Sequence, residues 1–192
     1  MSHPPDPSTT GIGHLAIADL HALCDDPVRS LLAEFLPLIH ASELAVWVKD
    51  PAADQLIALL DTLGPGGPVE LKITQPLSSG IVSQVFREQS PFLDEGVWRS
   101  KTQSPLVDQA LRQSTLHEMC VPFHLVGHPL GVLCAVQLSD SIHQAPARWG
   151  FTRADLAILK VAAQAIAIGM ERAYLSQNWS TAGAGGIGRV CA

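Results

Sequence analysis

The stretch from Leu116 to Leu138, LHEMCVPFHLVGHPLGVLCAVQL, decides the fold class of this chain. Its two β-prone runs, 116–126 and 130–138, are joined by Gly127-His128-Pro129, and this pattern predicts a β-hairpin. Pro122 lacks a backbone donor, which predicts a sheet edge or a bulge, and Gly131 predicts a close backbone approach or a bend. The hairpin therefore belongs to a sheet that curves.

The segments around the hairpin predict a mixture of strands and helices. Strands are expected at 42–49, 55–61 and 71–74, and helices at 14–24, 27–40, 80–88 and 105–113. Asp26 is the expected N-cap of the second helix, and Pro37 is expected to bend it or end it early. The clearest helix follows Thr152 and reaches about residue 174, with Thr152 and Asp155 resembling a capping box. The predicted organisation is a flexible tail at 1–13, one domain at 14–178 and a flexible glycine-rich tail at 179–192.

Four phrases along the chain resemble those of the GAF domain family. They are LSSGIV at 77–82 followed by Ser90-Pro91-Phe92, MCVPF at 119–123, GVLCAV at 131–136 and FTRADL at 151–156. Their order and separation fit a GAF domain that spans about 25–175. The resemblance implies an α+β fold with a central antiparallel sheet of five to six strands. The terminal helices would pack on one face, and the mid-chain helices and loops would enclose a pocket on the other.

Composition and charge exclude several functional classes. The formal net charge is −6 and no stretch is rich in Lys or Arg, so no nucleic-acid surface is expected. The apolar stretch around 156–170 is interrupted by Lys160 and Gln164, so no membrane span is expected. The N-terminus does not resemble a signal peptide. The four cysteines, Cys24, Cys120, Cys134 and Cys191, form no CxxC motif, which favours reduced thiols and a cytoplasmic location.

The residue pattern predicts no metal site and no catalytic residue. Glu118, Cys120 and His124 alternate onto one face of a strand, but Glu118 and His124 would lie about 20 Å apart. No GxSxG motif is present. The GAF family includes enzymes that reduce free methionine sulfoxide with loop cysteines, and residues 80–115 contain no cysteine. The cyclic-nucleotide signature of the family is half matched, by Phe151 and Asp155. We therefore expect a non-enzymatic protein, and the sequence does not identify a cofactor.

A small effector, if one binds, is expected between the 74–115 region and the inner face of the sheet. Pockets of this kind are mostly apolar with a few polar groups. The predicted lining residues are Phe86, Phe92, Asp94, Trp98, Phe123 and Leu133.

The last helix predicts a homodimer. Its apolar seam repeats at 3-4-3-4 spacing, and most of the remaining surface is apolar as well, so the helix must be buried on more than one side. The expected contact residues between two copies are Leu159, Ala163, Ile166 and Met170.

Three functional hypotheses follow. The first is a cytoplasmic sensory or regulatory module, which binds a small effector or partner protein and signals through its terminal helices to a separate output protein. The second is a small redox enzyme on the same fold, similar to a methionine sulfoxide reductase. The third is a dimerisation module that binds no ligand.

Overall fold

The computed structural model describes residues 15–62, 73–94, 114–139 and 148–184. Six strands of this part form one antiparallel sheet in the order β3-β2-β1-β6-β5-β4. The strands are β1 (Glu43–Lys49), β2 (Gln55–Asp61), β3 (Thr74–Pro76), β4 (Phe92–Asp94), β5 (Thr115–Leu125) and β6 (His128–Leu138). The predicted antiparallel sheet of five to six strands is confirmed.

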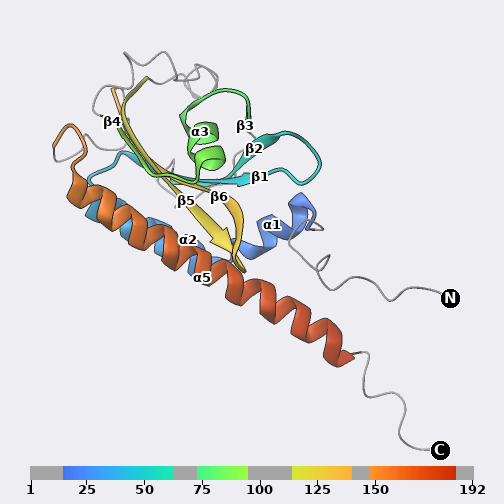
Figure 1. Ribbon diagram of the computed structural model, residues 1–192. Helices are drawn as coiled ribbons and strands as arrows, with labels where there is room; N and C mark the ends of the chain where they lie inside the picture. The colour runs from blue at the N-terminus through green and yellow to red at the C-terminus, as the bar shows by residue number, and fades with distance from the viewer. Residues whose placement is uncertain (1–14, 63–72, 95–113, 140–147, 185–192) are drawn as a thin grey trace, which may run out of the picture.

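Within the described residues, the helices cover the two faces of the sheet unequally (Figure 1). On one face lie α1 (Ile17–Leu23), α2 (Asp26–Ile39) and α5 (Arg153–Ala184), where α5 packs against α2 and β5. On the other face lies α3 (Ile81–Glu88), which contacts β5 and β6. We call these the α5 face and the α3 face. The predicted placement of the terminal helices on one face is confirmed.

The hairpin at the centre of the prediction is present, with a shorter connection than expected. Val126 and Gly127 form the turn, with φ of 48° and 79°, as in the type I′ turns that favour hairpins. A Cβ at Gly131 would lie 1.9 Å from the carbonyl oxygen of Trp47, so only glycine fits there. Pro122 lies beyond the end of β4, which pairs only with residues 118–120 of β5. On its other side, Pro122 stays in register with Val132 of β6.

Helix α2 ends where predicted, but its N-cap and the effect of Pro37 differ from the prediction. The N-cap is Asp25, not Asp26, and its carboxylate accepts a hydrogen bond from the Val28 backbone N–H at 3.2 Å. Pro37 lies inside the helix and does not end it early. The helix continues because Ile39 is fully buried in the core beneath it, and it ends at His40, whose φ is 57°.

Helix α5 begins at the predicted cap and continues further than expected. The Thr152 backbone N–H donates to Asp155 at 2.7 Å, and the Asp155 N–H donates to the Thr152 hydroxyl at 3.4 Å. The helix runs to Ala184, past the predicted domain end at residue 178, so the first part of the predicted flexible tail is helical. The predicted tail at 1–13, the helix at 105–113 and the remainder of the C-terminal tail lie outside the described residues.

The α3 helix starts without the predicted serine caps. Its N-cap is Gly80, with φ of 90°, and no side chain caps the helix. In the described part of the chain, no helix combines the length and the apolar character needed to cross a membrane.

Each face of the sheet has its own hydrophobic cluster. The larger one lies between the sheet and the helices α1, α2 and α5, and it is built from aliphatic residues together with Phe123 and Phe151. The smaller one lies under α3 and includes Trp47, Cys120 and Cys134. The alternation of side chains along each strand assigns residues to one cluster or the other.

Candidate functional site on the α3 face of the sheet

The α3 face carries ionisable and sulfur-containing side chains on the central strands. In β1, Leu44, Val46 and Val48 belong to the α5-face core. Alternation therefore places Glu43, together with Trp47, on the α3 face. In β5, the same alternation places Glu118 beside Cys120 on the α3 face.

Carboxyl groups gather at one end of this face. Glu43 and Glu118 both pair in register with Val136 of β6, so they lie in one row across the sheet. Asp61 of β2 pairs with Ala45, the second residue after Glu43 on the same face, and the backbone of Asp94 in β4 is in register with Glu118. Glu43 and Asp61 are each 3% exposed, and Glu118 is 7% exposed. Buried carboxyl groups are uncommon in proteins, and so many at one end of a face indicate a site with a chemical role.

Burial has a direct electrostatic consequence for Glu43. Removal of its carboxyl from water raises the pKa of Glu43 to about 8, and the negative charge of nearby Asp61 adds to this increase. At neutral pH the Glu43 carboxyl is therefore mainly protonated, and it can donate a hydrogen bond. An ordinary glutamate at this pH could only accept one.

A cysteine pair adjoins the carboxyl row. Cys120 and Cys134 face each other directly across β5 and β6, with 4.3 Å between their Cα atoms, and they form a disulfide. Oε1 of Glu118 lies 3.3 Å from Sγ of Cys120 and 3.2 Å from Sγ of Cys134. All three side chains are buried beneath α3. The Glu118 carboxyl group and the cysteine pair therefore lie together in the buried interior.

This disulfide corrects the expectation that Cys120 and Cys134 are separate reduced thiols. The two residues are far from a CxxC spacing, and only the register of the hairpin brings them together. The two-residue turn would by itself place 120 opposite 133, and the register shift between Phe123 and His124 brings 134 opposite it instead. Glu43 and Asp61 were also missed, since nothing near either residue in the sequence marks it as buried.

Three of the predicted ligand-binding residues lie on elements of the α3 face. Phe86 of α3 and Phe92 of β4 are half-buried and pack against the cluster under α3. Asp94 lies at the end of β4, in register with Glu118. The pocket predicted for this face stays a prediction. Trp98 lies outside the described residues.

Phe123 and Leu133 are placed wrongly by the prediction. Both belong to the core of the α5 face, with exposures of 3% and 0%. Each is the sequence neighbour of a residue that faces α3, and side chains of adjacent strand residues project to opposite faces of the sheet. They cannot line the same pocket as Phe86 and Phe92.

The predicted dimer contacts also need correction. Leu159, Ala163, Ile166 and Met170 are buried within the chain itself, in the core between α5 and the sheet. They are therefore core residues of one subunit and are unavailable to a second copy. The large apolar residues that α5 exposes between Arg153 and Gln177 are Val161 (56%), Ile168 (66%) and Leu175 (56%). We call these three the exposed seam.

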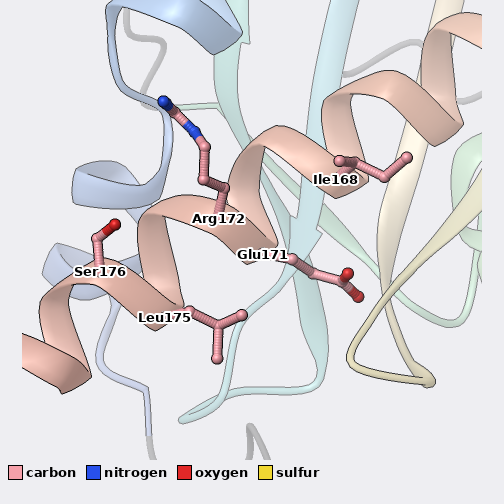
Figure 2. Close-up of a pocket in the computed structure, with 5 residues that line it drawn as sticks. All are labelled: Ile168, Glu171, Arg172, Leu175 and Ser176. Atoms are coloured by element: carbon pink, nitrogen blue, oxygen red, sulfur yellow. The ribbon is translucent and has the colours of Figure 1, made fainter.

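The exposed seam borders two shallow hollows of about 460 Å³ each. One is lined by Ile168, Glu171, Arg172, Leu175 and Ser176 (Figure 2). In Figure 2, Glu171 points toward the β5–β6 hairpin, while Arg172 points toward the N-terminal helices. These directions agree with the hydrogen bond from the Val126 N–H to Glu171 (2.5 Å) and the ion pair between Arg172 and Asp25 (2.7 Å). Polar contacts thus connect the outer side of α5 to the β5–β6 hairpin and to the N-terminus of α2.

Comparison with solved structures shows the same fold in other proteins. The free methionine-R-sulfoxide reductase of Neisseria meningitidis is 16% identical, with 82% of this chain and 87% of that chain covered and a TM-score of 0.58. The GAF-B domain of DevS from Mycobacterium smegmatis is 20% identical, with 79% and 95% covered and a TM-score of 0.55. The PixJ GAF domain of Thermosynechococcus elongatus is 15% identical, with 87% and 96% covered and a TM-score of 0.59. At these identities the similarity establishes the fold alone.

Sequence comparison identifies the family. A search among curated proteins gives no significant match. A family model described as GAF domain matches residues 25–171, which is most of the chain. GAF domains form a sensory and regulatory fold, and the six-stranded sheet with its terminal helices has the architecture of the solved GAF domains. The chain belongs to the GAF domain family.

Proposed function

We propose that this chain is a sensory module that binds a small effector on the α3 face and relays the binding event through α5, and that it is not an enzyme. One observation carries the proposal. Strands β5 and β6 present Glu118, Cys120 and Cys134 on one face, and the same strands pack against α5 on the other. A ligand on the α3 face would therefore act on strands that contact the signalling helix.

The chemistry of the α3 face suits a small molecule with an apolar body and a polar end. Trp47 and the apolar side of α3 supply a hydrophobic surface. The buried carboxyl groups at the other end supply directed hydrogen bonds, including a donor from protonated Glu43. Phe92 on β4 packs against the edge of this hydrophobic cluster.

The proposed relay follows physical contacts. Residues Val121 and Phe123 lie on the opposite side of β5 from Cys120, in the core that α5 covers. The hydrogen bond from Val126 to Glu171 connects the tip of the hairpin to α5. A shift of the hairpin on effector binding would therefore change the position of α5, provided that the effector binds the two positions with different affinity.

We further propose that a second copy of the chain covers the exposed seam of α5. Val161, Ile168 and Leu175 recur every seven residues, which is the spacing of a helix that packs lengthwise on another helix. The C-terminal end of α5 extends beyond the sheet in Figure 1, so the sheet leaves it accessible for pairing. A separate output protein would read the orientation of the paired helices. The proposed location is the cytoplasm.

Native mass spectrometry of freshly purified protein, followed by thermal-shift screening of metabolites, tests the effector proposal. We expect a bound small molecule or a stabilising metabolite, whose effect falls at least about tenfold in Glu43→Leu, because leucine can neither donate nor accept a hydrogen bond. Glu34→Leu on the exposed side of α2 is the matched control and should leave the effect unchanged. A clean apo dimer with no stabilising metabolite would favour the ligand-free dimerisation module.

Sedimentation analysis tests the dimer. We expect Ile168→Glu to convert a dimer into a monomer, because it places a charge in the centre of the seam. Leu38→Glu on α2 introduces the same charge at another exposed apolar residue and should remain dimeric. A monomeric wild-type protein, or equal effects of the two substitutions, would contradict the proposed interface.

A second candidate function is reduction of a sulfoxide at the same site. The Cys120–Cys134 pair favours it, together with the fold shared with the Neisseria meningitidis reductase. The two thiols would reduce one sulfoxide to a thioether and water, and they would become the disulfide. Turnover of free methionine-R-sulfoxide with a dithiol reductant, lost in Cys120→Ser, would replace the non-enzymatic proposal.

A further inference from the structure

The cysteine pair and Glu118 form a compact set of donor atoms. Both Sγ atoms and a carboxylate oxygen of Glu118 lie within 4.8 Å of one another, and all three residues are buried. The donors come from adjacent strands in the centre of the sheet, with Glu118 and Cys120 on β5 and Cys134 on β6. Two thiolates with one carboxylate make a ligand set that favours zinc over magnesium or calcium.

The backbone geometry suits a metal when the disulfide is reduced. Zinc binds sulfur at about 2.3 Å, so two cysteine ligands of one tetrahedral ion have sulfurs about 3.8 Å apart. Side chains that project from Cα atoms 4.3 Å apart can reach this separation by rotation about their Cα–Cβ bonds. Oε1 of Glu118 already lies at almost equal distances, 3.3 and 3.2 Å, from the two sulfurs. The three donors therefore surround one position.

No metal site was expected because β5 by itself supplies too few ligands. It carries Glu118 and Cys120, but no third residue of this strand lies close enough to bind the same ion. The neighbouring strand β6 supplies Cys134 directly opposite, at a distance that no spacing along β5 could provide.

We propose that, in its reduced state, the protein binds one Zn²⁺ through Cys120, Cys134 and Glu118. The fourth coordination position is open to water or to an added ligand, as in zinc sites with three protein ligands. The cation offsets the charge of two thiolates and a carboxylate, which would otherwise be costly to bury together. Disulfide formation uses the same two sulfurs, so the metal and the disulfide exclude each other.

This exclusion makes the zinc site sensitive to oxidation. A hydroperoxide accepts two electrons from the two zinc-bound thiolates as its O–O bond breaks. The sulfurs join as the disulfide, two protons from solvent complete the reduced oxygen product, and Zn²⁺ leaves. With hydrogen peroxide the products are two waters, the Cys120–Cys134 disulfide and free Zn²⁺. The zinc site goes beyond the proposed effector function and stands whether or not an organic effector binds.

Zinc binding to the reduced full chain is the first test. We expect one zinc per chain by elemental analysis after dialysis, and a thiolate-to-cobalt absorption band when Co²⁺ replaces zinc. Cys120→Ser and Cys134→Ser should each weaken zinc binding by at least about 100-fold, more than the loss of an outer-shell partner. Glu118→Gln should weaken binding about 10- to 100-fold and keep the thiolate band.

Matched cysteine variants separate this site from general thiol binding. Cys24→Ser removes a buried cysteine from the core of the α5 face and should leave the stoichiometry and affinity unchanged. Cys191→Ser is a second control. Loss of zinc in either control to the same degree as in Cys120→Ser would overturn the assignment.

A measurement on the wild-type protein tests the proposal even if the variants fail to fold. Hydrogen peroxide added to the zinc-loaded protein should release one zinc per chain to a chromogenic chelator. The protein should lose two hydrogens in mass, with the disulfide mapped to Cys120 and Cys134. A reduced wild-type protein that binds no stoichiometric zinc, or that keeps its zinc after the disulfide forms, would refute the proposal.

Discussion

The two faces of the sheet are made from the same strands and carry different chemistry. The α5 face is covered by three helices over an almost wholly apolar core. In the residues that the structure describes, the α3 face is covered by one short helix, and it holds Glu43, Glu118 and the Cys120–Cys134 pair. Buried carboxyl groups destabilise a fold unless they are compensated, whereas buried aliphatic groups stabilise it. The α5 face therefore holds the domain together and allows the α3 face to carry groups with chemical functions.

The largest expected effect comes from the α5 face. Leu133→Ala should lower the free energy of unfolding by about 2–5 kcal/mol, because it leaves a cavity in a core where Leu133 is fully buried. Urea denaturation monitored by circular dichroism measures this loss. Leu38→Ala, at an exposed site on α2, should change stability by less than about 0.5 kcal/mol. A loss below about 1 kcal/mol in Leu133→Ala would break the proposed division between the faces.

A smaller and pH-dependent effect is expected on the α3 face. Because the pKa of Glu43 is raised from 4.5 to about 8, the folded state holds a proton that the unfolded state releases between these values. Wild-type stability should therefore fall as the pH rises from about 4.5 to 8. Glu43→Gln removes this dependence and should be more stable than wild type by about 1–3 kcal/mol at pH 8.5, with little difference at pH 4.5. A stability difference that does not change with pH would contradict the buried position of Glu43.

The N-terminus of α5 should show the opposite pH dependence. Burial would raise the pKa of Asp155, but hydrogen bonds from Thr152 and Arg148 outweigh it and lower the pKa below 3.8. Asp155→Asn should cost about 1–2 kcal/mol at pH 7, since the ionised carboxylate caps the helix. The difference should shrink as the pH falls through about 3.8, where the unfolded state takes up a proton, and it should be lost once the pH is below the lowered pKa of the folded carboxylate. Arg153→Gln, on the exposed first turn, is the control in the same thermal unfolding series.

The smallest effect is expected at the surface between α5 and α2. Arg172 and Asp25 form an ion pair at 2.7 Å, but Arg172 is largely exposed, so Arg172→Gln should cost less than about 0.5 kcal/mol. Asp25→Ala should cost about 1 kcal/mol, because it also removes the N-cap of α2. Equal losses in the two variants, measured by denaturant titration, would mean that the ion pair contributes more than its exposure indicates.

Most secondary structure could be predicted because its signals are local. The hairpin followed from two β-prone runs around Gly127, and the start of α5 followed from Thr152 and Asp155. The errors arose where neighbouring residues offered equivalent signals or where tertiary packing overrode a local rule. Asp25 and Asp26 can both cap a helix that begins near Pro27, and α2 passes Pro37 because Ile39 is buried.

The candidate site could be predicted only in part. The pattern placed Phe86, Phe92 and Asp94 on the elements that border the α3 face, but it placed Phe123 and Leu133 there as well. Which of two adjacent strand residues faces a pocket depends on the direction of the pleat, and apolar runs on a sheet covered on both faces do not reveal it. The same ambiguity affected α5, whose predicted dimer seam packs on its own sheet.

The sequence by itself determined that this chain has a GAF-type antiparallel sheet with a long terminal helix that is apolar on two sides. Only the tertiary structure decided which side of that helix packs inward, and which polar residues meet. Glu43 and Asp61 come from different strands, as do Cys120 and Cys134, and each pair is joined by the register of neighbouring strands. Local propensity acts over a few residues, whereas register is determined by the packing of the whole sheet, and for this reason the buried carboxyl groups and the cysteine pair emerge only in the folded protein.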